Sequence, residues 1–157
     1  MLKEKAKAPL SVRVTDAEGK PVSFRDYAGK VVVLFFYPKD DTPGCTVEAK
    51  QFEEYSPKLK KLGVVVIGVS KDNGKSHQKF ADKYNLSFPL WSDPDHKLMD
   101  AFGTWQLKKF MGREYMGTTR STFVIDSKGT VVKVFEKVSP AEHGEEVYAF
   151  LKEFTQK

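Results

Sequence analysis

The sequence contains only one cysteine, Cys45, so no disulfide can form within the chain. Its longest apolar run, Val31–Tyr37, is far shorter than the roughly 20 residues of a membrane-spanning helix. Positive and negative charges are interspersed around a net charge of +5, which gives little support to a nucleic-acid surface. No apolar segment follows the first lysines, so we expect no secretory signal, no membrane contact and a cytoplasmic location.

The remaining pattern predicts one α/β domain over residues 1–157, with a central mixed β-sheet flanked by helices. Continuous apolar runs rich in β-branched residues predict two strands buried on both faces, and residues 11–24 favour an N-terminal β-hairpin. The strands are expected at residues 11–15, 22–24, 31–37, 64–69, 88–91, 121–125 and 130–135. The helices are expected at residues 43–62, where Pro57 predicts a kink or restart, 75–84, 95–102 and 142–154. Residues 103–119 show no clear period and are predicted to be a long loop.

The segment around Cys45 lies where a buried strand is followed by a helix, and open α/β sheets place ligand sites there. Thr42 followed by Pro43 is typical of an N-cap with proline in the first helical position. Cys45 would then lie in the first helical turn, where the helix dipole and free N–H groups favour a thiolate. A buried structural cysteine behind an ordinary Thr-Pro cap explains the same pattern, and these arguments alone leave both interpretations open.

The residues Pro38-x-x-x-Thr42-x-x-Cys45 resemble the active-site motif of the peroxiredoxins. The longer run from Phe36 to Ala49 is similar to the bacterioferritin comigratory protein subfamily, also called peroxiredoxin Q. Its similarity continues downstream and covers most of the chain, in three further segments: Gly103-x-Trp105, Met111-Gly112-Arg113-x-Tyr115-x-Gly117 and Arg120-Ser121-Thr122-Phe123-Val124-Ile125-Asp126. This resemblance implies a thioredoxin-like fold and a thiol-dependent peroxidase that reduces hydrogen peroxide and organic hydroperoxides.

The resemblance also implies a role for each matching residue. Cys45 would be the peroxidatic cysteine, and the Thr42 hydroxyl would bind the thiolate and the peroxide unless it caps the helix instead. Arg120 would supply a fixed positive charge beside the sulfur. Pro38 would shield the sulfur from water, and the backbone N–H groups at Gly44 and Cys45 would bind the peroxide oxygens.

The chain departs from this subfamily in lacking a resolving cysteine. Lys50 occupies one position where relatives carry it, and residues 75–84 contain none. The resemblance therefore implies a one-cysteine cycle in which an external thiol reduces the sulfenic acid of Cys45. The candidates are thioredoxin, glutaredoxin, a small thiol or another partner protein. A natural absence and an engineered loss of the second cysteine both fit the sequence, and we expect a monomer because no long exposed apolar stripe stands out.

Other chemistry-bearing residues receive structural interpretations. The histidines are expected at the surface or at helix ends, with no metal site: His77, His96 and His143. Asp40 and Asp41 favour a solvated turn. Three aromatic residues are expected to pack under the long loop: Trp105, Phe110 and Tyr115. The alternative is that they form an apolar wall beside the site. No organic cofactor site is visible.

Two functions of other classes are alternatives to the peroxidase. A thioredoxin-like disulfide exchanger would need a Cys-x-x-Cys motif, which the sequence lacks. A non-enzymatic binding or holdase module of the same fold would have no need to retain Thr42, Cys45 and Arg120 together. A Cys45→Ser variant separates the binding module from the peroxidase, because a binding module keeps its activity and a peroxidase loses it.

Overall fold

The computed structural model describes residues 1–136 and 138–155. Its helices are α1 (Pro43–Lys61), α2 (Gly74–Tyr84), α3 (Lys97–Phe102) and α4 (His143–Thr155), with a 3₁₀ helix η1 (Phe24–Tyr27). Its strands are β1 (Val14–Thr15), β2 (Pro21–Val22), β3 (Val31–Phe36), β4 (Val64–Ser70), β5 (Leu90–Ser92), β6 (Trp105–Phe110), β7 (Arg113–Thr118), β8 (Ser121–Ile125) and β9 (Val131–Phe135).

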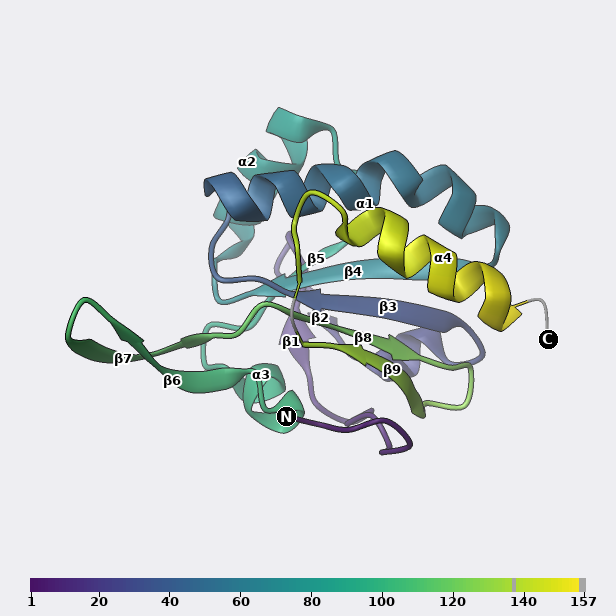
Figure 1. Cartoon of the computed structure of the whole chain (residues 1–157), viewed down its shortest axis with the longest axis horizontal. Helices are drawn as coiled ribbons and strands as arrows, with labels where there is room; N and C mark the ends of the chain where they lie inside the picture. Colours follow the sequence, from purple (N-terminus) through teal and green to yellow (C-terminus); the bar gives the residue numbers. More distant parts are fainter. Residues whose placement is uncertain (137, 156–157) are drawn as a thin grey trace.

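A seven-stranded mixed sheet in the order β2-β1-β5-β4-β3-β8-β9 forms the centre of the molecule (Figure 1). Strand β3 pairs in parallel with β4 and antiparallel with β8, so it lies inside the sheet. This position explains its unbroken apolar run, since a strand covered on both faces has no solvent side for polar residues. The predicted mixed sheet, its N-terminal hairpin and the β8–β9 hairpin are confirmed.

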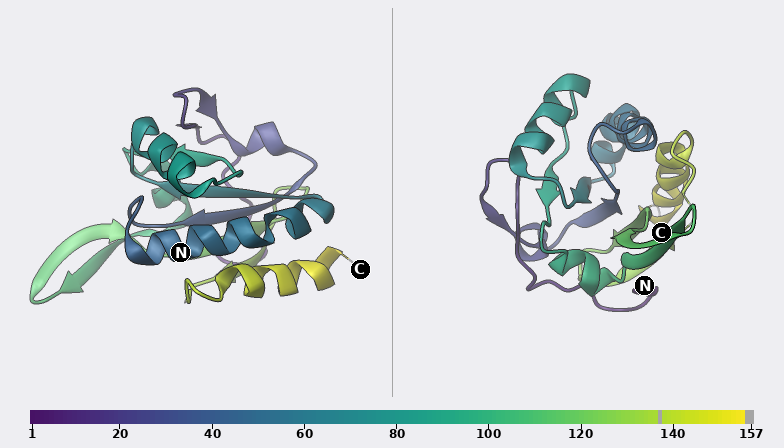
Figure 2. Two further views of the ribbon diagram at one scale, coloured as in Figure 1. Left: turned by 90° about the horizontal axis from the view of Figure 1, so that it is seen from above. Right: turned by 90° about the vertical axis from the view of Figure 1, so that its left-hand side faces the viewer.

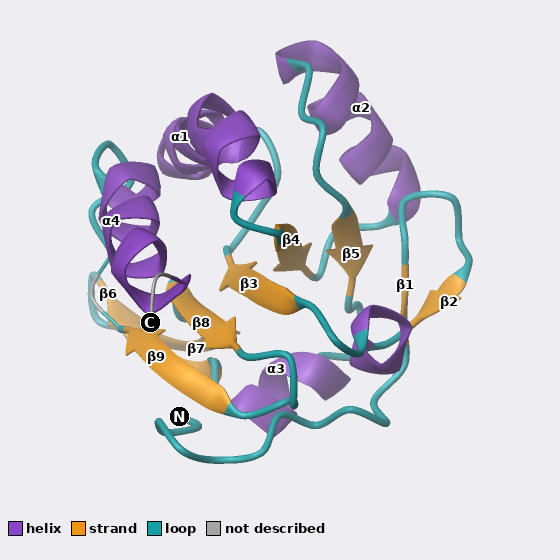
Figure 3. Ribbon diagram, turned by 90° about the vertical axis from the view of Figure 1, so that its right-hand side faces the viewer, coloured by secondary structure: helices purple, strands orange, loops and turns teal. Residues whose placement is uncertain are grey.

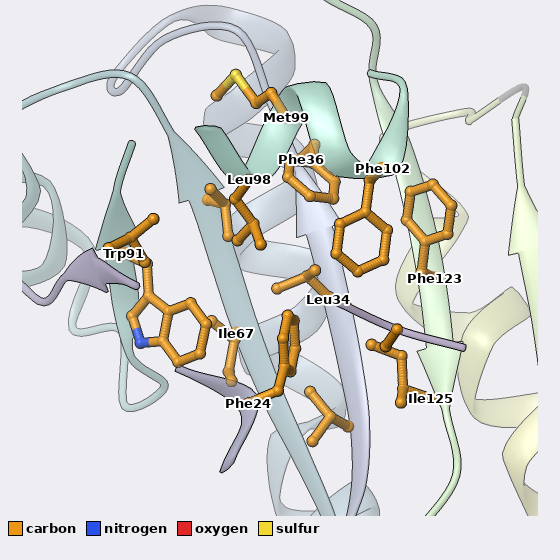
Figure 4. Close-up of a cluster of buried hydrophobic side chains, with 14 of the residues drawn as sticks. Phe24, Leu34, Phe36, Ile67, Trp91, Leu98, Met99, Phe102, Phe123 and Ile125 are labelled. Carbon is orange, nitrogen blue, oxygen red and sulfur yellow. The ribbon is translucent and has the colours of Figure 1, made fainter. Parts of the chain in front are cut away.

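Helices cover both faces of the sheet. Helices α1, α2 and α4 lie on one face, and α3 with the N-terminal segment lies on the other (Figures 1 and 3). Each face has its own hydrophobic core. The core under α3 contains large buried aromatic and aliphatic side chains, among them Phe24, Trp91, Phe102 and Phe123 (Figure 4). The other core contains Cys45.

Helix α1 begins one residue after Thr42 and continues through Pro57 as a single element, so the predicted restart is wrong. It ends at Lys61, and Gly63 follows in the left-handed region at φ 76°, which suits a residue without a Cβ. None of the helices in the described part of the chain has the length and apolarity needed to span a membrane.

The predicted long loop at residues 103–119 is wrong. These residues form a two-stranded antiparallel hairpin of β6 and β7, which pairs with no strand of the main sheet. We call this hairpin the β6–β7 arm. Figure 1 shows it extending away from the body. Most of its side chains are exposed on both faces, and strand patterning by alternation depends on one buried face. The period that would have identified these strands is therefore missing.

Candidate active site

Cys45 is the third residue of α1, directly after the loop that leaves the carboxyl end of β3. Its side chain lies in the core between the sheet and α1, and the residue is only 1% exposed. Thr42 has the extended backbone of an N-cap, and its carbonyl accepts the amide of Thr46 at 2.8 Å. The first turn of α1 therefore begins where the sequence predicts, with Cys45 inside it.

The side chain of Thr42 does not cap this helix. Its hydroxyl donates to the carbonyl of Lys39 at 2.9 Å instead. The predicted capping interaction is therefore wrong for the side chain, although the residue occupies the N-cap position. The half-buried Thr42 hydroxyl keeps lone pairs free to accept a further hydrogen bond.

Arg120 brings a positive charge to the sulfur from the sheet, just before β8 begins. Its Nη2 donates to Cys45 Sγ at 3.1 Å, and its Nη1 donates to Glu48 Oε1 at 2.6 Å. The side chain is 20% exposed. Burial alone would lower the pKa of Arg120, but the charges of Glu48 and Cys45 outweigh burial and raise it. Arg120 therefore stays charged and fixed between the two groups, so the structure brings the predicted pair Cys45 and Arg120 together.

Glu48 belongs to the same cluster, although the sequence analysis assigned it no role. It lies one helical turn after Cys45, is fully buried, and its Oε2 has no hydrogen-bond partner among the described residues. Burial raises its pKa to about 7 despite the opposing effect of Arg120. The spacing of three residues, which places Glu48 and Cys45 on one helix face, was the signal that could have identified it.

Gly44 lies directly beneath the guanidinium group. A Cβ at this position would come within 3.3 Å of Arg120 Nη2 and 4.0 Å of Pro140. Such a contact is tight, so a larger residue here would press on the arginine that contacts the sulfur. Pro38 is half-buried two residues after β3 ends, and it directly follows the buried Tyr37.

The loop between β3 and α1 is anchored by a buried polar network, which corrects two predictions. Asp40 was expected in a solvated turn and His77 at the surface or at a helix end, yet their side chains are 3% and 0% exposed. Asp40 accepts the Tyr37 hydroxyl at 2.6 Å and the Ser76 hydroxyl at 2.7 Å, and its carboxylate lies 2.7 Å from His77 Nδ1. The other ring nitrogen donates to the Trp91 carbonyl at 2.9 Å.

This network holds the loop against α2, because His77 lies on the buried face of that helix one turn before Phe80. Burial, followed by the charge of Asp40, raises the pKa of Tyr37 well above its ordinary value, so its hydroxyl stays a donor. Asp41, in contrast, remains exposed and pairs with Lys83 at 2.9 Å, as a solvated turn residue would.

His143 is the first residue of α4, which agrees with the helix-end prediction, but it is buried and does not lie at the surface. Its Nε2 lies 2.6 Å from the Thr122 hydroxyl, and its Nδ1 lies 3.1 Å from Glu146. Burial lowers its pKa, and Arg120 adds to this effect. His96 immediately precedes α3 and is partly exposed, which agrees with the helix-end prediction. No cluster of three or more potential metal ligands occurs in residues 1–136 and 138–155.

The three aromatic residues expected under the loop have separate environments. Trp105 stacks on His96 at a ring distance of 4.3 Å and packs against the core beneath α3, on the other face of the sheet from Cys45. Phe110 is 65% exposed and Tyr115 is 48% exposed. Packing under a loop is therefore wrong for both, and neither contributes to an enclosed apolar wall.

A buried cysteine in the first turn of a helix, contacted by an arginine at the carboxyl end of a central strand, is a candidate thiol-based catalytic site on an α/β sheet. Residues 5–134 match the AhpC/TSA family. The chain is similar to peroxiredoxin Bcp of Bacillus subtilis (strain 168), with 46% identity over 151 residues that cover 96% of each chain. It shares 41% identity with peroxiredoxin Bcp of Escherichia coli K12 over 88% of each chain.

Solved structures agree with these sequence relatives. The bacterioferritin comigratory protein of Xanthomonas campestris, described for alkyl peroxide reduction, superposes with a TM-score of 0.89 at 38% identity over 94% of each chain. A PrxQ of Xylella fastidiosa superposes with a TM-score of 0.92 at 32% identity over 98% of each chain. The chain belongs to the AhpC/TSA family and, within it, to the Bcp and PrxQ peroxiredoxins.

Family membership confirms the thioredoxin-like fold and the thiol-dependent peroxidase, and it decides against the disulfide exchanger and the binding module. Its substrate is a peroxide, and its reductant is a thiol. The single cysteine agrees with a member that lacks a resolving cysteine.

Proposed function

We propose that the Cys45 thiolate attacks one oxygen of a peroxide and that Arg120 stabilises the charge before and during this step. The observation that carries the proposal is the guanidinium group shared between Cys45 Sγ at 3.1 Å and Glu48 at 2.6 Å. A fixed cation in a largely buried site stabilises an anion more strongly than it would in water. Glu48 holds the arginine in place and acts on the sulfur only through it.

The oxidation step balances as a two-electron transfer. The sulfur of Cys45 forms a bond to one peroxide oxygen, the O–O bond breaks, and its electron pair leaves with the second oxygen as hydroxide or alkoxide. The products are a Cys45 sulfenic acid and water or an alcohol after protonation. Hydrogen peroxide and organic hydroperoxides are both substrates under this proposal. The relative described for alkyl peroxide reduction supports the second class.

The neighbouring residues receive supporting roles. The Thr42 hydroxyl and the backbone N–H groups at Gly44 and Cys45 would bind the peroxide oxygens as charge moves to the leaving oxygen. Pro38 would shield the sulfur from water. Trp105 would act only at a distance, through its pairing with Thr118, two residues before Arg120.

The reduction step needs a thiol from outside the chain, because Cys45 is the only cysteine. A thiolate attacks the sulfur of the sulfenic acid, water leaves, and a mixed disulfide forms; a second thiol then releases the Cys45 thiolate. Thioredoxin, glutaredoxin and small thiols all supply these two electrons. Because Cys45 is 1% exposed, the first turn of α1 must open before a protein thiol can reach it.

We further propose that residues 1–157 act as one domain, as a monomer in the cytoplasm and without nucleic acid as a partner. The two cores that share one sheet support the single domain. The β6–β7 arm exposes apolar side chains that the monomer prediction did not foresee, so the oligomeric state is measured in the experiment on the arm described below.

Intact mass spectrometry after rapid mixing with one equivalent of hydrogen peroxide tests the oxidation step. We expect the wild type to gain one oxygen within seconds, Cys45→Ser to gain none, and Arg120→Ala to react about 100- to 1,000-fold more slowly. Arg25→Ala is the matched control, because Arg25 is an exposed arginine on η1, before the amino end of β3. Equal rates for Arg120→Ala and Arg25→Ala would contradict the role of Arg120.

A further inference from the structure

The β6–β7 arm extends from the end of the molecule at which α1 begins. Figure 1 and the view from above in Figure 2 both show the hairpin extending beyond the amino-terminal end of α1. Its strands pair only with each other, from Trp105 opposite Thr118 to Phe110 opposite Arg113. Both outer edges of the arm are therefore unpaired with the main sheet and face solvent.

The arm carries most of the exposed large apolar side chains of the described chain. Of seven such residues, five lie on it: Leu107, Phe110, Met111, Tyr115 and Met116. Met111 at the tip is 88% exposed. A sixth, Val47, lies on α1 two residues after Cys45. Clustering of exposed apolar residues around one site marks an interaction surface, whereas single scattered ones do not.

The arm is also basic. Residues 105–118 contain three cationic side chains, Lys108, Lys109 and Arg113, against the single carboxylate of Glu114, which gives a net charge of +2. Lys109 pairs with Glu114 at 3.5 Å, so Lys108 and Arg113 are the cations left to face a partner. A surface of this kind matches a partner with an apolar contact area and an acidic rim.

The base of the arm is fixed to the catalytic site. Thr118 at the end of β7 is buried, and Thr119 donates to Gln106 Oε1 at 3.0 Å across the base. The next residue is Arg120, which contacts Cys45 Sγ. Trp105 stacks on His96 and secures the other strand. A protein that binds the arm therefore lies beside the end of the molecule that carries the reactive sulfur.

We propose that the β6–β7 arm is the docking surface for a dithiol protein reductant of the thioredoxin class, whose reactive cysteine lies in an apolar area with an acidic rim. The proposal rests on the proposed one-cysteine cycle. A small thiol needs no such surface, whereas a protein thiol must be held at the buried sulfur while α1 opens. One reductant thiolate forms the mixed disulfide with Cys45 and releases water. The second thiolate attacks the reductant's own sulfur, so that Cys45 leaves as a thiolate and the reductant leaves as a disulfide.

Three rates measured on full-length protein test the docking surface. The first is oxidation of Cys45 by hydrogen peroxide, the second is rereduction by dithiothreitol, and the third is kcat/KM for a bacterial thioredoxin recycled by its reductase and NADPH. We expect Phe110→Ser combined with Met111→Ser to lower the third rate at least tenfold and to leave the first two unchanged. Leu10→Ser is the matched control, because Leu10 is a 36% exposed apolar residue outside the arm.

A charge variant gives an independent measurement. Arg113→Glu should lower kcat/KM for thioredoxin and reduce its dependence on salt, while Arg25→Glu should change neither. Unchanged thioredoxin rates in both arm variants would overturn the proposal, as would a wild type that dithiothreitol reduces and thioredoxin does not. Failure of the proposed peroxidase would appear separately, as loss of the first rate in the wild type.

Sedimentation velocity at several concentrations examines the rival occupant, a second copy of this chain. A wild-type monomer agrees with the proposal. A dimer that Phe110→Ser with Met111→Ser dissociates, at an unchanged thioredoxin rate, would assign the arm to self-association and overturn it.

Discussion

Cys45 and Met111 lie at opposite extremes of exposure, although only β7 and Thr119 separate the arm's turn from Arg120, which contacts Cys45. Cys45 is 1% exposed beside a buried guanidinium and carboxylate, whereas Met111 is 88% exposed at the tip of a free hairpin. The comparison separates the two halves of the catalytic cycle. Attack on a peroxide needs fixed charge in a dry site, and reduction by a protein needs an accessible surface.

Removing Asp40 from the buried polar network that anchors the loop before α1 should have the largest effect on the free energy of unfolding. Asp40→Ala removes the carboxylate that lies against His77 Nδ1 and accepts the Tyr37 and Ser76 hydroxyls. Leaving buried polar groups without partners costs about 1–3 kcal/mol of unfolding free energy for each group, and Asp40→Ala leaves more than one such group. We expect urea unfolding to shift accordingly, and the peroxide reaction to slow because the loop before Thr42 loses its anchor.

Asp41→Ala is the matched control for this change. Asp41 is the neighbouring carboxylate, exposed and paired with Lys83, so its removal should leave the urea midpoint nearly unchanged. Equal midpoints for the two variants would show that the network does not stabilise the loop.

Glu48 gives the next largest effect, as a pH dependence of stability. The folded chain holds its proton up to about pH 7, whereas the unfolded chain releases it near the ordinary value of 4.5. Between these two pH values unfolding releases a proton, so the unfolding free energy falls as the pH rises. The difference of about 2.5 pKa units corresponds to a loss on the order of 3 kcal/mol between pH 4.5 and pH 7.

Urea titrations at pH 5 and pH 8 measure this effect. Glu48→Gln should remove most of the decline that the wild type shows, whereas Glu54→Gln, at an exposed position of the same helix, should keep it. The comparison of Glu48→Gln with Glu54→Gln isolates the buried carboxylate from the loss of one carboxylate on the same helix. A decline that persists in Glu48→Gln would show that Glu48 is already ionised at pH 5.

The sequence predicted the sheet and the helices, because both depend on local signals. Apolar runs indicate buried strands, and the Thr42–Pro43 pair indicates the start of a helix. The Cys45–Arg120 contact, which joins residues far apart in the chain, came from the resemblance to a family rather than from any local pattern.

The polar interior was missed for a physical reason. Asp40, His77 and His143 are residue types usually found at the surface, and their burial depends on partners supplied by other elements. The partners of Asp40 are Tyr37, just after β3, and two residues of α2, which no spacing along the chain reveals. The arm was missed for the opposite reason, since strands without a buried face carry no period.

Substitutions in the β6–β7 arm should have the smallest effect on stability, in contrast to Asp40→Ala. Phe110 and Met111 lose little exposed area on folding, so Phe110→Ser with Met111→Ser should change the unfolding free energy by no more than about 0.5 kcal/mol per site. Urea unfolding of this variant, beside Asp40→Ala, measures both regions under one condition. A loss of several kcal/mol in the arm variant would mean that the hairpin packs on the body in solution, and the contrast between a buried catalytic region and a free docking region would no longer hold.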